Sequence, residues 1–218
     1  MTLFNEQSPR REVAPGAVHL PAWLSLDQQQ RLVRAFNEWS VAPVPMRSAT
    51  VRSGSLMSVK TVCLGWHWQP YRYTRAADDV NGLAVAPFPE WLGDIARSVV
   101  AEAYGSDGAQ RYQPDAAMIN YYDDVAKMGM HQDRDELVDE PVVSLSVGDT
   151  CRFRFGNVNN RNKPYTDIDL QSGDAFVFGG ASRFAYHGVT KMFPRSAVSA
   201  CGLESGRINI TMRVTGKT

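Results

Sequence analysis

Two histidines and one aspartate carry the clearest chemical signal in this chain of 218 residues. His131 and Asp133 are separated by one residue, and His187 lies further along the chain. Two imidazoles and one carboxylate can hold Fe(II) on one side and leave coordination positions open for an organic acid and O₂. In a strand, His131 and Asp133 would point to the same face and could reach one ion. So short a pattern also arises by chance, and a surface pair with an unrelated histidine is the alternative.

A second signal is the alternation of polar and apolar residues over 207–213, Arg-Ile-Asn-Ile-Thr-Met-Arg. As a strand, this segment places Arg207, Asn209, Thr211 and Arg213 on one face and its apolar residues on the other. A guanidinium binds a carboxylate through two parallel hydrogen bonds, so two arginines suit a dicarboxylic co-substrate. An edge strand with solvated arginines is the alternative, which the histidine pattern upstream disfavours.

Two helices are expected before these segments. Ser25 and Gln28 have the spacing of a capping box, in which each side chain bonds the backbone of the other residue. Pro89 suits the first turn of a second helix over about 89–104. Apolar residues then recur at helical spacing in both segments. These stripes are Leu32, Val33, Phe36 and Trp39 in the first helix, and Trp91, Leu92, Ile95, Val99 and Ala103 in the second.

From residue 112 onward, short alternating runs separated by turn residues predict β-strands. The runs are 142–147, 151–155, 166–170, 174–178 and 207–214. An antiparallel jelly roll is a natural host, because its mouth can bring ligands from separate strands around one pocket. The expected fold class is α+β, mainly β, in one domain over 1–218. Its expected parts are helical support over about 1–40 and 88–105, a lid over about 41–75 and a jelly-roll core over about 112–218.

Residues 66–73, Trp-His-Trp-Gln-Pro-Tyr-Arg-Tyr, contain four aromatic side chains interleaved with His and Arg. One interpretation is a hairpin whose rings pack onto the barrel. The other is a substrate lid whose rings stack on a flat ligand. Composition does not decide between them, and both stay open at this point.

Composition limits the classes of partner and the compartment. The 23 basic and 23 acidic side chains cancel, which argues only against tight non-specific binding of nucleic acid. Three widely spaced cysteines without a CxxC pair suit a reducing cytosol. No apolar stretch approaches the roughly 20 residues that span a bilayer. The polar segment from Met1 to Glu12 lacks the apolar core of a signal peptide. We expect a cytoplasmic protein that does not associate with membranes.

Four segments in this order resemble the AlkB family, the Fe(II)- and 2-oxoglutarate-dependent dioxygenases that repair alkylated nucleobases. They are Asn-Tyr-Tyr at 120–122, His-Gln-Asp-Arg-Asp-Glu at 131–136, Ser-Arg-Phe-Ala-Tyr-His-Gly at 182–188, and the alternating strand at 207–213. The resemblance covers nearly the whole chain and is closest to the bacterial prototype. It implies a double-stranded β-helix, another description of a jelly roll, with a β-rich lid that recognises a nucleotide.

The resemblance also assigns a role to individual residues. It implies that His131, Asp133 and His187 bind iron, that Arg207 and Arg213 hold the two carboxylates of 2-oxoglutarate, and that Asn120, Tyr122 and Asn209 hydrogen-bond this co-substrate. It implies that the substrate contacts are Trp66 as a stacking surface opposite His131, Tyr71 at a phosphate, Met118 in the pocket, Asp135 with Glu136 near the exocyclic amine, and Arg161 at the entrance. Asp135 joins the three iron ligands as a catalytic residue.

The function implied is oxidative demethylation of N-alkylated bases, such as 1-methyladenine and 3-methylcytosine, in single- or double-stranded DNA. The reaction would use Fe(II), would consume O₂ and 2-oxoglutarate, and would release formaldehyde, succinate and CO₂. The enzyme would act as a monomer. An oxygenase acting on RNA or on a small molecule is the alternative in the same class. A metal-binding jelly roll without turnover is a third hypothesis. The paired arginines disfavour the third, and the aromatic and acidic residues favour a base over a small acid.

Overall fold

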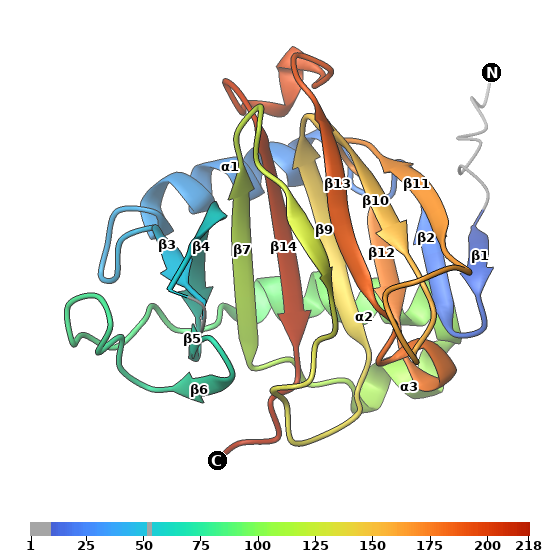
Figure 1. Cartoon of the computed structure of the whole chain (residues 1–218), viewed down its shortest axis with the longest axis horizontal. Helices are drawn as coiled ribbons and strands as arrows, with labels where there is room; N and C mark the ends of the chain where they lie inside the picture. The colour runs from blue at the N-terminus through green and yellow to red at the C-terminus, as the bar shows by residue number, and fades with distance from the viewer. Residues whose placement is uncertain (1–9, 52–53) are drawn as a thin grey trace.

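Two antiparallel sheets make up the body of the protein in this computed structural model, which describes residues 10–51 and 54–218 (Figure 1). The larger sheet has the strand order β1-β2-β12-β9-β14-β7-β4-β3, and the smaller one β11-β10-β13-β8. The larger sheet comprises β1 (Arg11–Ala14), β2 (Ala17–Leu20), β3 (Arg47–Thr50), β4 (Leu56–Leu64), β7 (Ala116–Tyr122), β9 (Val142–Gly148), β12 (Ala175–Phe178) and β14 (Arg207–Arg213). The smaller comprises β8 (Met128–His131), β10 (Thr150–Phe155), β11 (Thr166–Leu170) and β13 (His187–Phe193).

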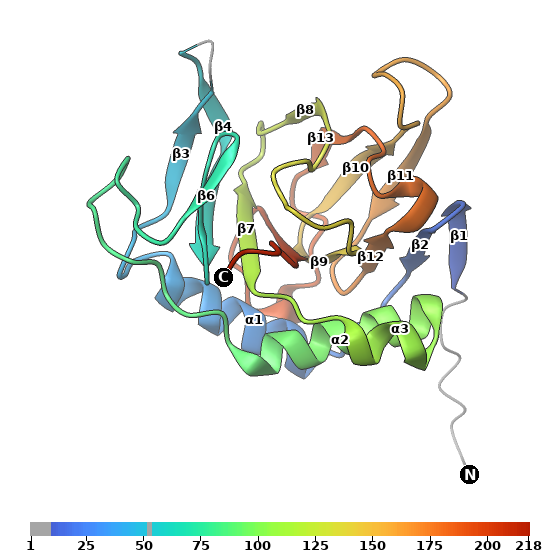
Figure 2. The ribbon, with the colours of Figure 1, turned by 90° about the horizontal axis from the view of Figure 1, so that it is seen from below.

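Three helices cover the outer face of the larger sheet, and the smaller sheet lies on its other face (Figure 2). They are α1 (Leu26–Trp39), α2 (Glu90–Tyr104) and α3 (Ser106–Arg111). The predicted capping box is confirmed at α1, where the Ser25 side chain accepts from the Gln28 amide and the Gln28 side chain accepts from the Ser25 amide. Pro89 is the residue just before α2. The six-residue helix α3 was not predicted, because it is too short to show an apolar period.

The alternation over 207–213 is confirmed as the central strand β14, which pairs with β7 and β9. Its apolar side chains Ile208, Ile210 and Met212 are fully buried in the main core with residues of α1 and α2. The polar residues therefore face the opposite side, between the two sheets. The strand β14 is therefore buried on both faces, and its polar residues line a cavity between the two sheets.

The other predicted strands of the core are also present, as β9, β10, β11 and β12. Successive layers of helices, large sheet and small sheet agree with the predicted jelly-roll fold. In the part of the chain that the structure describes, no helix has both the length and the apolar character needed to cross a bilayer. Most of the polar N-terminal segment, residues 1–9, lies outside the described residues.

The segment over about 1–40, predicted as helical support, contains α1 and also a hairpin of β1 and β2 at the edge of the larger sheet, which was not predicted. Gly16 makes the turn between them with a φ of 78°, a conformation that favours glycine. A Cβ atom there would lie against the carbonyl oxygen of Gly179, so this close approach also requires glycine. Four-residue strands give too short an alternation to detect in the sequence.

The predicted lid over 41–75 divides into two parts. The strands β3 and β4 extend the larger sheet through the pairing of β4 with β7. Only β5 (His67–Gln69) and β6 (Arg72–Thr74) form a separate two-stranded hairpin beside it. Tyr71 lies in the turn between them with a φ of 76°, which is a strained conformation for a tyrosine. Such strain persists where the surrounding structure holds it and is common at binding sites.

Candidate metal centre and active site

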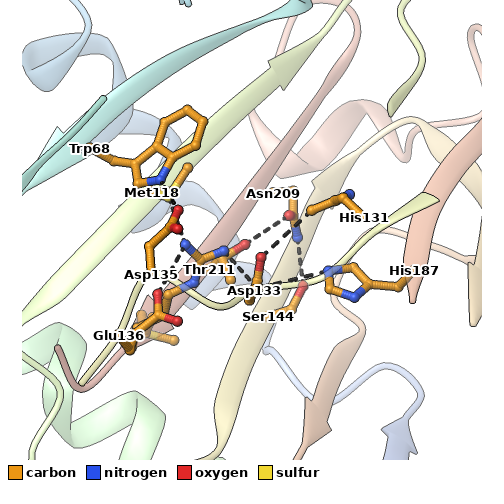
Figure 3. Close-up of polar contacts among 12 residues, drawn as sticks. Trp68, Met118, His131, Asp133, Asp135, Glu136, Ser144, His187, Asn209 and Thr211 are labelled. Carbon is orange, nitrogen blue, oxygen red and sulfur yellow. Dashed lines mark hydrogen bonds and ion pairs between the residues drawn. The ribbon is translucent and has the colours of Figure 1, made fainter. Parts of the chain in front are cut away.

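His131, Asp133 and His187 come together between the two sheets, and one ligand atom from each lies within 4.8 Å of the others (Figure 3). The Nε2 atoms of His131 and His187 lie 3.6 and 3.8 Å from the two carboxylate oxygens of Asp133. His131 ends β8 and is paired in register with His187, which begins β13. Asp133 follows two residues after the end of β8. The pairing of β8 with β13 therefore brings the two histidines together. Asp133 joins them from the segment that follows β8 and not by alternation along a strand.

The hydrogen bonds of both histidines leave the same ring nitrogen available for a metal. The Nδ1 atom of His131 lies 2.9 Å from the carbonyl oxygen of Gly129, and that of His187 lies 2.9 Å from the carbonyl of Ala185. A carbonyl only accepts, so each Nδ1 carries the proton and each Nε2 presents a lone pair. Burial, followed by the charge of His131, lowers the pKa of His187 to about 4. At neutral pH this imidazole is uncharged, as metal binding requires.

Asp133 is held as a carboxylate by the arginine at the end of β14. The Nη2 atom of Arg213 donates to Asp133 Oδ2 over 2.7 Å, and both side chains are buried. Burial by itself raises the pKa of Asp133, but the charge of Arg213, aided by His187 and His131, lowers it well below its usual value. Arg183 also donates to the Asp133 carbonyl oxygen at 2.8 Å. The ligand is therefore ionised and held at both its side chain and its backbone.

Arg207 lies on the wall of a small chamber of about 40 Å³ beside the triad. Its Nη2 atom donates to the Ser146 hydroxyl at 2.7 Å. Its Nε and Nη1 atoms are buried and have no hydrogen-bond partner among the described residues. An unpaired buried guanidinium edge is costly unless a ligand satisfies it. A carboxylate of a dicarboxylic acid is the matching group, so the residues present suit 2-oxoglutarate next to a metal held by the triad.

The other residues expected to bind the co-substrate line the same chamber. The Asn209 amide donates to the Ser144 hydroxyl at 2.6 Å, and Asn120 accepts from the Thr61 hydroxyl at 2.9 Å. Tyr122 is buried at the back of this chamber. Their placement agrees with the roles implied by the family resemblance. Arg213 also lines this chamber, and its role toward 2-oxoglutarate stays a prediction. Its guanidinium contacts Asp133 and the Tyr73 hydroxyl, and its Nε atom is buried without a hydrogen-bond partner among the described residues.

A larger cavity of about 560 Å³ opens on the other side of the triad. Tyr71, Met118, Asp135 and Arg161 lie on its wall, where the resemblance places substrate contacts. Lys127 and Arg134 add two more basic side chains to the lining. His131 and Asp133 line both this cavity and the small chamber. A group bound in the larger cavity would therefore lie against the metal ligands and would be lined by an aromatic, basic and acidic wall.

Trp66 does not occupy the predicted position at the substrate cavity. Its side chain is buried with Tyr73 and Ala116, its indole donates to Asp115 Oδ2 at 3.1 Å, and it is absent from the lining of both cavities. The guanidinium of Arg75 covers the ring at 3.5 Å. The geometry therefore corrects the expectation that Trp66 is the stacking surface.

Trp68, two residues later, lines the larger cavity instead. It is the outward member of β5, whose neighbours His67 and Gln69 are buried. Its indole donates to Asp135 Oδ2 at 2.8 Å (Figure 3). Alternation in the sequence could not have identified Trp68, because residues two apart share a face of a strand and the pattern treats Trp66 and Trp68 alike. The two rings are separated because Trp66 lies before β5 and bonds Asp115 instead.

Glu136 likewise differs from its expected role near the base. Its side chain is buried, accepts from Tyr73 at 2.6 Å and from Arg183 at 2.9 Å, and lines neither cavity. It forms part of the support beneath Asp133, together with Arg213 at 3.5 Å. Asp135 lies on the cavity wall, whereas the next residue, Glu136, points into the protein interior. Arg183 and Tyr73 complete this support and were missed, since buried ion pairs between distant segments leave no pattern in the sequence.

The fold and the site together define a 2-oxoglutarate-dependent Fe(II) oxygenase. The chain matches the profile of the 2OG-Fe(II) oxygenase superfamily over residues 16–213. It is 33% identical to the alpha-ketoglutarate-dependent dioxygenase AlkB of Escherichia coli, covering 100% of this chain and 99% of that protein. The chain belongs to the AlkB family of these oxygenases.

The chain is also similar to a solved structure and to a plant protein. The solved structure of OsALKBH1 superposes with a TM-score of 0.85 at 30% identity, covering 94% of this chain and 99% of that one. The DNA N(6)-methyladenine demethylase ALKBH1D of Arabidopsis thaliana is 31% identical over 92% of this chain. The chain spans about half the length of that plant protein, 50%, and of its relative ALKBH1C, 49%.

Proposed function

We propose that this chain removes methyl groups from N-methylated nucleobases in DNA by oxidation that depends on Fe(II), O₂ and 2-oxoglutarate. The observation that supports this best is the position of the triad between two cavities. The small chamber contains an unpaired arginine edge for an organic acid, and the larger cavity contains an aromatic ring and a carboxylate. E. coli AlkB, of which the chain covers nearly the full length, is a named alpha-ketoglutarate-dependent dioxygenase, which supports the same reaction.

The residues of this chain would position the two reactants. His131, Asp133 and His187 would hold Fe(II), and Arg207 would bind one carboxylate of 2-oxoglutarate. When bound, iron with 2-oxoglutarate and O₂ supplies an oxidant that hydroxylates the N-methyl carbon, while 2-oxoglutarate leaves as succinate and CO₂. The resulting N-hydroxymethyl base releases formaldehyde and the restored base. The protein adds position, charge and exclusion of water.

The larger cavity would receive a base turned out of its strand. A duplex hides the methyl group, so an enzyme of this kind extrudes the base or takes a single strand. Trp68 would stack on the base, and such stacking contributes roughly 1–3 kcal/mol per base with little sequence preference. The basic residues Lys127, Arg134 and Arg161 would lie near the phosphates.

Asp135 would select the damaged base by charge. A base methylated on its Watson–Crick face, such as 1-methyladenine or 3-methylcytosine, is a cation, whereas the undamaged base is neutral. A carboxylate on the cavity wall favours the cation. Asp135→Ala should then reduce turnover of cationic lesions far more than it weakens Fe(II) or 2-oxoglutarate binding. Equal losses in all three would contradict this role.

Coupled product release tests the proposal directly. The purified chain with Fe(II), 2-oxoglutarate and ascorbate is incubated with an oligonucleotide that contains one 3-methylcytosine or with its unmethylated twin. We expect formaldehyde and succinate in equal amounts, and only with the methylated strand. Succinate that rises equally with both strands would refute the proposal. Matched methylated RNA and a panel of small organic acids in the same assay test the alternatives within the class.

We also propose that the working form is a cytoplasmic monomer acting on single- or double-stranded DNA. The triad supports a monomer, because one copy supplies all three metal ligands. Light scattering of the Fe(II)-loaded protein, with and without a methylated strand, tests the monomer. Comparison of single-stranded and duplex substrates in the formaldehyde assay tests the form of DNA.

A further inference from the structure

The indole of Trp68 and the carboxylate of Asp135 form one unit on the wall of the larger cavity. Trp68 Nε1 donates to Asp135 Oδ2 at 2.8 Å, across 67 positions of sequence. Both residues line the cavity. Within the part of the chain that the structure describes, the other oxygen, Asp135 Oδ1, has no hydrogen-bond partner. One side of the carboxylate is thus occupied, and the other remains an acceptor.

The backbone of Trp68 is itself held on both sides. Its carbonyl oxygen accepts from Arg47 Nη2 at 2.6 Å, and its amide donates to Cys63 Sγ at 3.4 Å. Cys63 and the neighbouring Met118 belong to a small buried cluster on which the Trp68 ring packs. The indole is therefore placed by the lid and the sheet, independently of Asp135. It can act as a fixed donor that orients the carboxylate.

We propose that Trp68 determines specificity by orienting Asp135, so that the free carboxylate oxygen accepts from an exocyclic amino group of the methylated base. This inference rests on the function proposed above and deepens it. An indole N–H only donates and an ionised carboxylate only accepts, so the pair can form in one sense only. Bases that carry an amino group next to the methylated nitrogen complement the free oxygen. Bases that carry an oxo group there place two acceptors against each other.

The bases 3-methylcytosine and 3-methyluracil carry an amino and an oxo group at the same ring position, and they also differ in charge. Variants of Trp68 test this inference with that pair, because they leave the charge of Asp135 in place. We expect the wild-type chain to prefer 3-methylcytosine in kcat/KM. Trp68→Phe keeps a ring for stacking but removes the donor, and should reduce this preference by about tenfold, while the KM for 2-oxoglutarate stays unchanged. Trp66→Phe is the matched control, since it removes an indole donor that bonds Asp115 outside the cavity.

Asp135→Asn provides a second test through its comparison with the double variant that also carries Trp68→Phe, because both variants lack the charge of Asp135. The Trp68 donor should draw the amide oxygen of Asn toward itself, which turns the amide NH₂ toward the base. The preference should then shift to 3-methyluracil, which offers an acceptor. In the double variant Trp68→Phe with Asp135→Asn, the amide can rotate, so this inverted preference should disappear. Melting temperatures of all four variants identify any that fail to fold, and the Asp135→Asn variant tests the proposal even if Trp68→Phe does not fold.

The results separate this inference from the proposed function. No formaldehyde from either base with the wild-type chain would overturn the proposed function. Formaldehyde with the wild-type chain would overturn the role of Trp68 alone if Trp68→Phe left the preference unchanged in both the Asp135 and the Asp135→Asn background. The same loss of preference in Trp66→Phe would also overturn it, because the effect would then not depend on the cavity wall.

Discussion

Arg213 and Asp133 form a buried ion pair of 2.7 Å that joins the central strand β14 to the metal centre. The Nη1 atom of Arg213 donates to the Tyr73 hydroxyl at 3.0 Å, and its Nε atom is buried without a hydrogen-bond partner among the described residues. Tyr73 in turn donates to Glu136 at 2.6 Å. One arginine therefore connects the lid hairpin, the segment after β8 and the co-substrate strand. Arg213 therefore holds the carboxylate of Asp133, and it also lines the small chamber together with Arg207.

Removal of Arg213 should destabilise the metal-free protein. Arg213→Met leaves Asp133 as a buried carboxylate without its closest cation, and breaking such a pair costs about 3–5 kcal/mol. The free energy of unfolding in urea measures this loss. The double variant Arg213→Met with Asp133→Asn should recover part of it, because no buried charge then remains unpaired. The exposed pair of Arg154 with Asp167 supplies the control, for which Arg154→Met should have a much smaller effect. Equal losses in the two arginine variants would contradict this role.

Arg207 should control the affinity for 2-oxoglutarate and leave metal binding unchanged. Arg207→Lys keeps the positive charge but loses the planar fork that pairs with a carboxylate. We expect the KM for 2-oxoglutarate to rise at least about tenfold, as for the loss of one charge-assisted hydrogen bond. The affinity for Mn(II) in the absence of 2-oxoglutarate, measured by calorimetry, should stay near the wild-type value. A large loss of Mn(II) affinity would place Arg207 in the metal centre instead.

Occupation of the triad should stabilise the fold. A metal that binds only the folded state at 100 times its dissociation constant adds about 2.7 kcal/mol to the free energy of unfolding. Mn(II), which resists oxidation better than Fe(II), should therefore raise the melting temperature, and a chelator should reverse the effect. His187→Ala should abolish the shift. The matched variant His19→Ala removes a histidine bonded to Asp174 away from the site and should retain it.

Acid should destabilise the lid through His67. This side chain is fully buried, and burial lowers its pKa below the ordinary value of 6.5. The unfolded chain therefore binds a proton more readily than the folded one. The contribution of His67 to the free energy of unfolding is fully present above the ordinary pKa of 6.5 and is lost as the pH falls below it. Urea unfolding between pH 7.5 and pH 5 should show this decline. In His67→Gln the slope should be smaller, and an identical slope would refute the role of His67.

Much of the core and the metal centre could be predicted from the sequence. The alternation over β14 indicated correctly that Arg207 and Arg213 share a face, because a strand imposes a period of two on its side chains. The capping box at Ser25 located the start of α1 for a similar local reason. The ligand types of His131, Asp133 and His187 were compatible with iron, and the arginines of 207–213 with the family resemblance made iron and an organic acid the prediction.

The lid and the support beneath Asp133 depended on contacts between distant segments. The choice between Trp66 and Trp68 follows from Asp115 and Asp135, which bond the two indoles from positions far along the chain. Glu136 is drawn inward by Arg183, 47 positions away. A local pattern shows which residues share a face but not which face meets a cavity.

Sequence alone thus determined the chemistry available to this protein, namely the metal ligands, the paired arginines and the aromatic segment near them. Tertiary structure decided which of these groups face the substrate. Asp133 illustrates the physical reason. The strand β8 ends at His131, so the carboxylate of Asp133 is held by Arg213 and its backbone carbonyl by Arg183, rather than by alternation along a strand. Buried charges take the orientation that pairs them, and their partners come from wherever the fold brings them.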